Sequence, residues 1–361
     1  MGTFAIDQAE RELYAIRRGG EDILKHANYV LGPEVDLLEG HLAKDFGTRH
    51  AVGCNSGFGA HLLSLLALGI GPLPGDTVLV SAFSPASFAG AVLRRAATVK
   101  LADVAPGDVH LAADGVQGAA REVQAIVVHH LFGAAADMPA ILKAAEDTPI
   151  MEVASYSLGA AIDGKRVGTF GTIGTADLRE KTSLGAYGDA GLILTDDDAT
   201  ASRLREIRRE TGCSEVFTGI TAGNFHMDTL HAAILLHKLE FRAAEARQRA
   251  LVGKAFLDAL ASAGVTELTV PANRQEVTRL VVLAEQRDEL ARQLNSRTVK
   301  ARPWWPVPIH LQPGFRELGY ARGDFPNAED VAARSLEIPL PQSAAEAEHV
   351  AGLVAEFYGH R

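Results

Sequence analysis

The chain has 361 residues, 47% of them hydrophobic and 22% charged, and contains no Pro-, Ser- or Gln-rich tract. This length suggests about two domains, and the composition excludes disordered, collagen-like and low-complexity proteins. Thirty-five Lys and Arg against 45 Asp and Glu give a formal net charge of −10, and the basic residues are scattered, which argues against nucleic acid as a partner.

Features that would direct the chain to a membrane or an oxidising compartment are missing from the sequence. No apolar run approaches the roughly 18 to 20 residues of a membrane span, and the first twenty residues lack the apolar stretch of a signal peptide. Cys54 and Cys213 are too few for a disulfide framework or a four-thiolate zinc site. We therefore expect a cytoplasmic protein with no membrane partner.

Residues 33 to about 235 alternate helical periodicity with short runs of Val, Ile, Leu and Ala. This alternation is typical of an α/β fold, in which helices cover a mainly parallel sheet. Helical spacing and early prolines predict helices from Pro33 and over Asp137–Ala145. Continuously apolar runs predict six strands, at Val78–Ser81, Thr98–Ala102, Ala125–Val128, Ile150–Val153, Thr172–Ala176 and Gly191–Leu194.

A periodic run from Met227 to about Ser262 contains no Pro and one Gly, which predicts a single long helix. This helix would connect the α/β part to a smaller α+β part. We expect a large domain over residues 1–235, with a helical segment at its start, and a small C-terminal α+β domain over residues 236–361.

Seven short motifs follow one another along nearly the whole chain, and each is weak by itself. They are Tyr29-Val-Leu-Gly-Pro-Glu-Val, His50-Ala-Val-Gly-Cys-Asn-Ser-Gly, Ala67-Leu-Gly-Ile-Gly with Pro74-Gly-Asp, His130-Leu-Phe-Gly with Asp137-Met, Val167-Gly-Thr-Phe-Gly, Leu184-Gly-Ala-Tyr-Gly-Asp, and His310-Leu-Gln-Pro-Gly-Phe-Arg-Glu-Leu-Gly-Tyr. In this order and spacing they resemble the DegT/DnrJ/StrS sugar aminotransferases, which are pyridoxal-phosphate (PLP) enzymes of fold type I. The resemblance implies a fold type I aminotransferase-like protein, a small-molecule substrate and a homodimer.

The resemblance places the lysine that binds PLP two residues before the Leu184 motif, where this chain has Thr182. Lys181 is adjacent, but its use requires a deletion before it and an insertion after it. A hydroxyl cannot form an imine, so a threonine at this position would remove the covalent step of transamination.

Other cofactor contacts of the family are also replaced. Val153 stands where the family has the aspartate that pairs with the pyridine nitrogen, and Tyr156 stands where it has a glutamine. The turn Asn55-Ser56-Gly57 is kept, but Phe58 replaces a threonine of the phosphate site and Asp177 replaces a serine. A carboxylate about 4 Å from the phosphate would cost on the order of 6 to 8 kcal/mol at an effective dielectric constant near 20.

These replacements predict that the chain keeps the fold, has lost PLP and uses no cofactor and no metal. The remaining polar groups suit a cofactor-independent acid/base enzyme that dehydrates, isomerises or cyclises a sugar, aminocyclitol or natural-product intermediate. We expect Asp177 to act as the base and Tyr156 as the donor to a developing oxyanion. The further catalytic candidates are Glu152, His130 and Lys181, and the substrate-binding candidates are Ser56, Phe58, Pro85, Phe88, Thr182, Asn224, Trp305 and His310.

Structural roles remain open for several of these residues. Glu152 and His130 also stand at scaffold positions of the family, and Lys181 lies in a charged run that suits a solvated loop. Trp305 either contacts the substrate or fills the junction between domains. Two other functions stay open: a non-catalytic partner in a heterodimer with an active aminotransferase, and an atypical PLP-dependent sugar aminotransferase that either uses Lys181 or binds PLP non-covalently.

Overall fold

The computed structural model describes residues 8–71, 75–179, 182, 184–209, 223–271 and 274–360. The α-helices are α1 (Gln8–Leu24), α2 (Pro33–Phe46), α3 (Gly57–Ala67), α4 (Ala86–Arg94), α5 (Ala113–Ala119), α6 (Met138–Ala145), α7 (Asp198–Arg208), α8 (Thr229–Ser262), α9 (Arg287–Ser296), α10 (Pro326–Arg334) and α11 (Ala344–Tyr358). Short 3-10 helices are η1 (Ala120–Glu122), η2 (Ile309–Leu311) and η3 (Pro313–Leu318).

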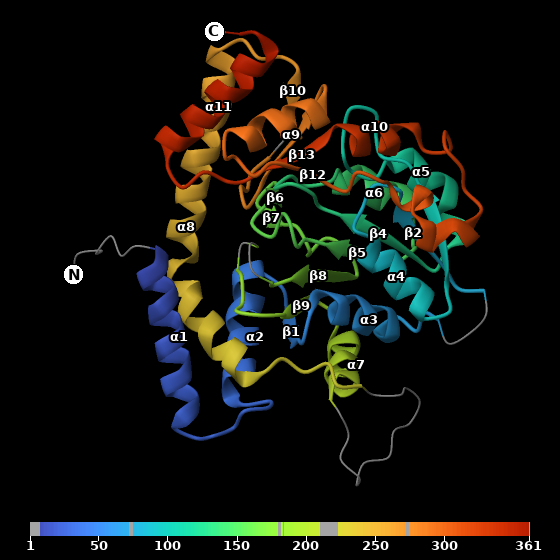
Figure 1. The fold of residues 1–361 in the computed structure, drawn as a ribbon. Helices are drawn as coiled ribbons and strands as arrows, with labels where there is room; N and C mark the ends of the chain where they lie inside the picture. Colours follow the sequence, from blue (N-terminus) through green and yellow to red (C-terminus); the bar gives the residue numbers. More distant parts are fainter. Residues whose placement is uncertain are drawn as a thin grey trace.

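Within the described residues the strands form three sheets. Figure 1 shows how the strands and helices are arranged. A seven-stranded sheet has the order β1 (His50–Cys54), β9 (Gly191–Thr195), β8 (Ile173–Asp177), β5 (Ile150–Val153), β4 (Ala125–His129), β2 (Thr77–Ser81) and β3 (Thr98–Ala102). A four-stranded sheet has the order β10 (Leu268–Thr269), β11 (Leu280–Ala284), β13 (Ser335–Ile338) and β12 (Arg302–Pro303), and β6 (Ala161–Ile162) pairs with β7 (Lys165–Arg166).

The large sheet is mainly parallel, as the sequence predicts. Strands β3, β2, β4, β5 and β8 run in one direction, and β9 is antiparallel to both β8 and β1. The parallel pairing brings the carboxyl ends of β4, β5 and β8 to one edge, where sites of open α/β sheets lie. All six predicted strands are confirmed, and β1 is an additional strand.

Helices cover both faces of the large sheet, which explains why its strands are apolar on both sides. On one face, Phe88 and Val92 of α4 pack with Val127 of β4 and Val153 of β5. On the opposite face, residues of α5 and α6 pack against β2, β4 and β5. The α/β fold class predicted from the sequence is therefore confirmed.

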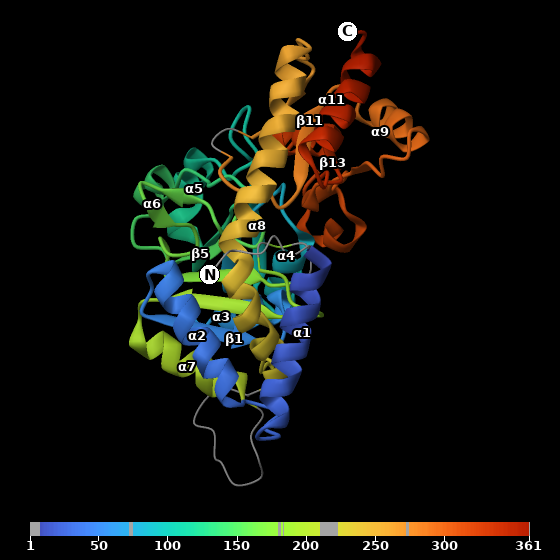
Figure 2. The same ribbon diagram turned by 90° about the vertical axis from the view of Figure 1, so that its left-hand side faces the viewer.

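The predicted long helix is α8, which has 34 residues. Ala232 and Leu235 near its start belong to the core of the large sheet, whereas Phe256 and Leu260 near its end belong to the core of the four-stranded sheet. Figure 2 shows α1 and α11 lying along different stretches of α8. The domain boundary expected at residue 235 falls within this helix and stays a proposal. Within the described ranges, no helix combines the length and apolarity needed to cross a bilayer.

Candidate functional site

The site begins at the turn between β1 and α3. Ser56 caps α3, since its side-chain oxygen accepts a hydrogen bond from the Gly59 backbone N–H at 2.9 Å. The Asn55 side chain holds the neighbouring segment by donating to the Asn224 carbonyl oxygen at 3.1 Å. The first turn of any α-helix presents N–H groups without intrahelical partners, so the start of α3 favours an anion.

Asp177, the last residue of β8, lies directly against this turn. A Cβ atom at Gly57 would lie 2.7 Å from the carboxyl carbon of Asp177, so the carboxyl group and the start of α3 are in contact. One carboxylate oxygen accepts from the Arg179 backbone N–H at 2.9 Å, and the other is 2.9 Å from Arg179 Nε. Burial raises the pKa of Asp177, and Arg179 partly opposes this rise.

Tyr156 belongs to an aromatic cluster at the carboxyl ends of β4 and β5. Its ring centroid lies 5.7 Å from the rings of both Trp304 and Trp305. Trp305 also packs on Phe132, at 6.1 Å. Phe132 and Trp305 have φ angles of 57° and 40°, which are strained for residues other than glycine. Burial raises the pKa of the Tyr156 hydroxyl, while the guanidinium of Arg279 lowers it.

Glu152 and His130 form a fully buried pair on the opposite face of the sheet. His130 Nε2 lies 2.9 Å from a carboxylate oxygen of Glu152, which also accepts from the Gly168 backbone N–H. The other oxygen accepts from the backbone N–H groups of Phe170 and Gly171, both at 2.6 Å. These hydrogen bonds link the ends of β4 and β5 to the turn at residues 168–171. The catalytic roles of His130 and Glu152 stay predictions.

His129 turns to the face covered by α3 and α4. It is 2% exposed, and neither ring nitrogen has a hydrogen-bond partner. The Phe88 ring packs near both histidines, with its centroid 6.1 Å from that of His129 and 4.5 Å from that of His61. Burial lowers the pKa of both histidines, that of His61 to about 3. Both imidazoles are therefore neutral at pH 7.

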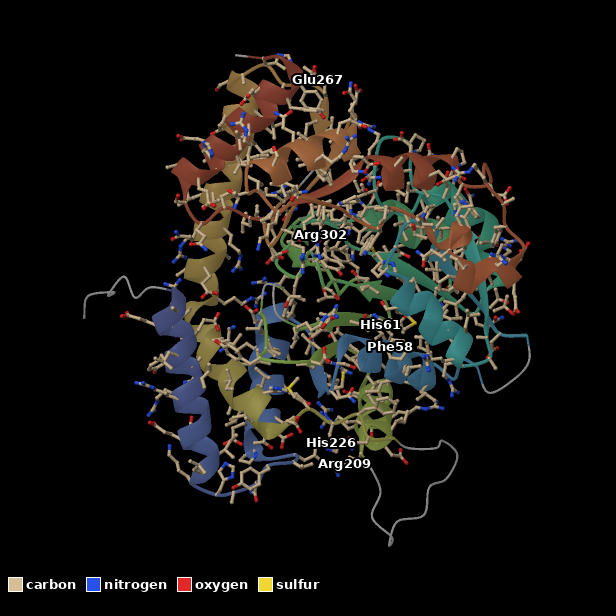
Figure 3. All side chains as sticks on the ribbon, viewed as in Figure 1. Phe58, His61, Arg209, His226, Glu267 and Arg302 are labelled. Atoms are coloured by element: carbon tan, nitrogen blue, oxygen red, sulfur yellow. The ribbon has the colours of Figure 1, made fainter. Side chains whose placement is uncertain are left out.

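The other sequence candidates are spread around these groups. Phe58, on α3 beside His61, is partly buried under the Arg94 guanidinium at 5.6 Å (Figure 3). Pro85 precedes α4 and is half-buried, whereas Phe88 is fully buried in the core. The Thr182 hydroxyl donates to the Arg179 carbonyl oxygen at 2.7 Å.

Two further candidates, His310 and Asn224, make contacts away from Asp177 and Tyr156. His310 lies on η2, where it pairs with Glu329 at 3.0 Å and packs against Phe325. Asn224 is exposed and contributes its carbonyl oxygen to Asn55. Lys181 lies outside the described residues. The charges of Asp177 and Arg179 both act on Tyr156, so the groups that the structure brings together are Ser56, Asp177 and Tyr156 with their neighbours.

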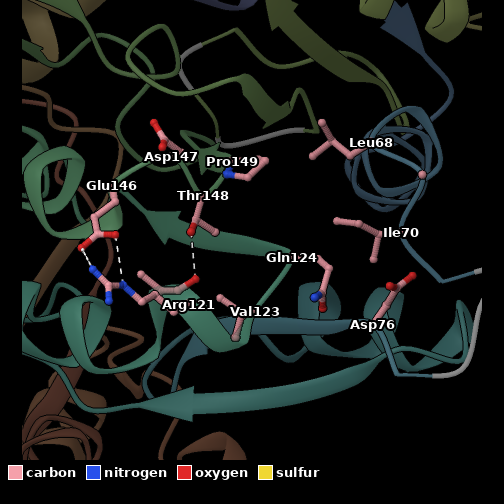
Figure 4. Close-up of a pocket in the computed structure, with 12 residues that line it drawn as sticks. Leu68, Ile70, Asp76, Arg121, Val123, Gln124, Glu146, Asp147, Thr148 and Pro149 are labelled. Atoms are coloured by element: carbon pink, nitrogen blue, oxygen red, sulfur yellow. Dashed lines mark hydrogen bonds and ion pairs between the residues drawn. The ribbon is translucent and has the colours of Figure 1, made fainter.

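A surface pocket lies at the other edge of the sheet (Figure 4). It is lined by residues that precede β2, β4 and β5, including Asp76, Gln124 and Pro149. Arg121 and Glu146 form an ion pair at its rim. This edge holds the amino ends of the parallel strands, so the pocket is separate from the groups around Asp177. Among the described residues there is no cluster of three or more His, Cys, Asp or Glu side chains suited to a metal.

Residues 14–356 match the DegT/DnrJ/EryC1/StrS aminotransferase family. The chain belongs to this family. It is 32% identical to the "Pleiotropic regulatory protein" of Geobacillus stearothermophilus over 98% of this chain and 97% of that protein. It is 32% identical to the dTDP-3-amino-3,4,6-trideoxy-alpha-D-glucose transaminase of Streptomyces venezuelae over 88% of this chain and 85% of that one.

Solved structures agree with this assignment. The S. venezuelae DesV structure in complex with a ketimine intermediate superposes with a TM-score of 0.90 and 29% identity, over 98% of this chain and 97% of that chain. A DegT DnrJ EryC1 StrS aminotransferase from Brucella abortus gives a TM-score of 0.88 and 28% identity, again over 98% and 97%.

The expectation that this chain uses no cofactor is wrong. Neighbouring structures hold a ketimine intermediate, the cofactor PMP or hydrated PLP, which points to PLP use within this family. That expectation counted replaced side chains, whereas a phosphate at a helix N-terminus is held largely by main-chain N–H groups. The capped start of α3 is intact and keeps its N–H groups whatever the side chain at residue 58.

The described residues offer a polar partner for each end of PLP, with one opposing charge. The start of α3 suits the phosphate, and His129 offers an unpaired imidazole beside Val153, the position where the resemblance puts the partner of the ring nitrogen. Asp177 opposes the phosphate when ionised, but its raised pKa makes protonation less costly than for an exposed aspartate. A protonated carboxyl can then donate a hydrogen bond to the phosphate.

Proposed function

We propose that this chain is a PLP-dependent aminotransferase that acts on the keto group of a nucleotide-linked sugar. The observation that carries this proposal is a 29% identical structure with a ketimine intermediate, matched over 98% of this chain. Relatives at 30 to 32% identity include transaminases of UDP- and dTDP-linked sugars. Bound PLP supplies a carbonyl group that accepts an amino group from a donor and passes it on.

Lys181 is the residue we propose to bind the PLP carbonyl. It follows β8 by four positions and is the only lysine of the sequence between Lys165 and Lys238. Its use in place of Thr182 requires a one-residue shift relative to the motifs of the family. The start of α3 binds the phosphate in this proposal, and Asp177 holds a proton at its carboxyl oxygen.

In this proposal Tyr156 and the neighbouring tryptophans, Trp304 and Trp305, form the substrate-binding part of the site. Tyr156 is a neutral phenol at pH 7 because burial raises its pKa, so it can donate a hydrogen bond to a carbonyl oxygen of the sugar. Trp305 is partly exposed and strained, and its ring offers an apolar face to the sugar. Asp177 and Tyr156 thus remain the proton-transfer candidates, now beside a cofactor.

Absorbance and trapping test this function. Purified protein mixed with PLP is expected to develop an absorption band of an imine, which borohydride reduces to an adduct on the peptide that contains Lys181. Lys181→Ala should abolish the band and the adduct, whereas Lys165→Ala, which changes a lysine on β7, should retain both. A wild-type protein that gives neither a band nor an adduct would overturn the proposal.

A second candidate function is that of a partner subunit for an active aminotransferase. Val153 and Phe58, which stand where the family has an aspartate and a threonine, favour this candidate. It requires that a homologue with a complete PLP site copurifies from the native host. A pure homodimer that aminates a sugar would eliminate it.

We also propose a homodimer. Tyr29, Val30, Leu31 and Leu230 are large apolar residues between 37% and 59% exposed, and backbone contacts join their two segments. Such a contiguous apolar surface marks a protein interface. A second copy of this chain is the expected occupant, and a mass in solution of two chains at micromolar concentration checks it.

A further inference from the structure

Strand β4 ends at His129 and is followed directly by His130, and the two side chains face opposite sides of the sheet. The second, His130, has both ring nitrogens engaged, with Glu152 on one side and the Ala136 backbone N–H on the other. The first, His129, has neither nitrogen engaged, although its side chain is almost fully buried. Its structural role as a packing residue does not require an imidazole, because an apolar side chain of similar size would fill the same volume without two unpaired polar atoms.

The side chains next to His129 are either apolar or, in the case of His61, an uncharged imidazole. The parallel register between β4 and β5 sets His129 directly opposite Val153, so the two side chains stand side by side on one face. The Phe88 ring presents an edge contact at 6.1 Å and offers no hydrogen-bond partner. The side chain of His61 also packs near Phe88 and has a contact with the Thr175 hydroxyl at 3.4 Å. An imidazole with one free donor and one free acceptor therefore points into this region.

This region lies close to the start of α3, the turn at Ser56 and Gly57 that favours an anion. His61 is four residues after Gly57 on α3, and Thr175 precedes Asp177 by two residues on β8. The start of α3 and the His129 imidazole thus border one part of the same sheet face. A ligand with an anionic group at one end and a ring nitrogen at the other has a partner in this chain for each end.

We propose that His129 hydrogen-bonds the pyridine nitrogen of PLP and takes the place of a carboxylate at residue 153. This inference rests on the proposed function and adds a positioning residue to it. Because the imidazole is neutral, it donates its N–H to an unprotonated ring nitrogen. The ring then carries no fixed positive charge and draws electrons less strongly than it would beside a carboxylate. The Phe88 side chain must turn to admit the ring, since it fills the space beside His129 in the described structure.

The test compares PLP with its 1-deaza analogue, in which a carbon replaces the ring nitrogen. The affinity of the full-length protein for each is measured by fluorescence quenching, which requires no turnover. One hydrogen bond to the ring nitrogen predicts that the wild type prefers PLP by about tenfold. His129→Leu should lose this preference while keeping its affinity for the analogue, and His129→Asn, which retains an N–H donor, should restore part of it.

His61→Asn is the matched control, because His61 is buried beside the same Phe88 ring but already has a contact, to the Thr175 hydroxyl at 3.4 Å. It should keep the preference for PLP. If His129→Leu binds PLP as selectively as the wild type does, the role of His129 is refuted and the proposed function stands. If the folded wild type binds neither molecule, the proposed function itself fails. Circular dichroism spectra of all variants establish that they are folded.

Discussion

Replacing Asp177 by Asn should tighten the binding of the cofactor phosphate. The carboxyl group touches the start of α3 and its side chain is only 19% exposed, so its charge acts with weak screening. At about 5 Å and an effective dielectric constant near 20, each phosphate charge is repelled by about 3 kcal/mol. Asn removes this repulsion and can still accept the hydrogen bond from the Arg179 backbone N–H.

Two processes limit the size of this effect. The Arg179 guanidinium attracts the phosphate and offsets part of the repulsion. Asp177 can also take up a proton, which at pH 7 costs at most about 4 kcal/mol, because burial raises its pKa above 3.8. A phosphate that carries about 1.5 to 2 charges is repelled by about 5 to 7 kcal/mol in total, so protonation is the smaller cost and determines the outcome. We therefore expect Asp177→Asn to gain up to about 4 kcal/mol, or up to about 1000-fold in affinity.

The pH dependence gives the sign of the same effect. Phosphate binding favours protonated Asp177, so wild-type affinity should fall as the pH rises above the pKa of the free carboxyl, by up to about tenfold per pH unit. The Asn variant lacks this dependence. Equilibrium dialysis with pyridoxamine 5′-phosphate between pH 5.5 and 8 measures it, because this ligand forms no imine with a lysine.

Asp189→Asn is the control, since Asp189 is an exposed neighbour whose charge acts on Asp177 from solvent. It should change the affinity by less than about threefold. Equal affinities and equal pH slopes for the wild type and Asp177→Asn would mean that the carboxyl group does not face the phosphate, and the assignment of the α3 turn would then be wrong.

Two further predictions concern stability. Glu152→Gln should lower the free energy of unfolding by about 3 to 5 kcal/mol, because an amide NH₂ would face backbone N–H donors in a fully buried site; urea unfolding checks this, with the exposed Glu122→Gln as control, and an unchanged midpoint would contradict it. Burial lowers the pKa of His61 from 6.5 to about 3, so the unfolded chain binds the proton first and stability falls as the pH drops below 6.5. His61→Leu should therefore lose about 2 kcal/mol less than the wild type between pH 7 and pH 5, and parallel losses in the two proteins would show that His61 is not buried in its neutral form.

The strands were predictable because both faces of the large sheet are covered. Runs such as Ala125–Val128 are apolar at every position, a pattern that local sequence reveals without knowledge of pairing. Strand β1 was not predicted, because it begins with His50 and contains Gly53 and is therefore not a continuously apolar run. The long helix was predictable from its periodicity and its lack of proline.

The site was predictable only in part, because its geometry depends on strand register. That Asp177 ends a strand, at the edge of the sheet where we propose that the cofactor binds, follows from the local pattern and the resemblance. That His129 stands beside Val153 depends on the pairing of two strands 24 residues apart, which no local pattern contains. The two consecutive histidines did carry a usable signal: at the end of a strand that is buried on both faces, one of them must turn towards each covered face.

The substitutions at residues 153 and 177 are best understood as one redistribution of charge. With an aspartate at 153 and a serine at 177, as the resemblance describes the family, the single acidic group lies at the ring end of the cofactor. This chain has valine at 153 and aspartate at 177, so in the proposed arrangement its acidic group lies at the phosphate end. The formal charge of the pair is unchanged, but the proton that a ring-side carboxylate would keep on the pyridine nitrogen is replaced by a proton that Asp177 can hold beside the phosphate. A neutral imidazole at 129 and a protonatable carboxyl at 177 are compatible with a cofactor whose ring is uncharged. The replacements at 153 and 177 therefore compensate for each other and are not two separate losses of cofactor binding.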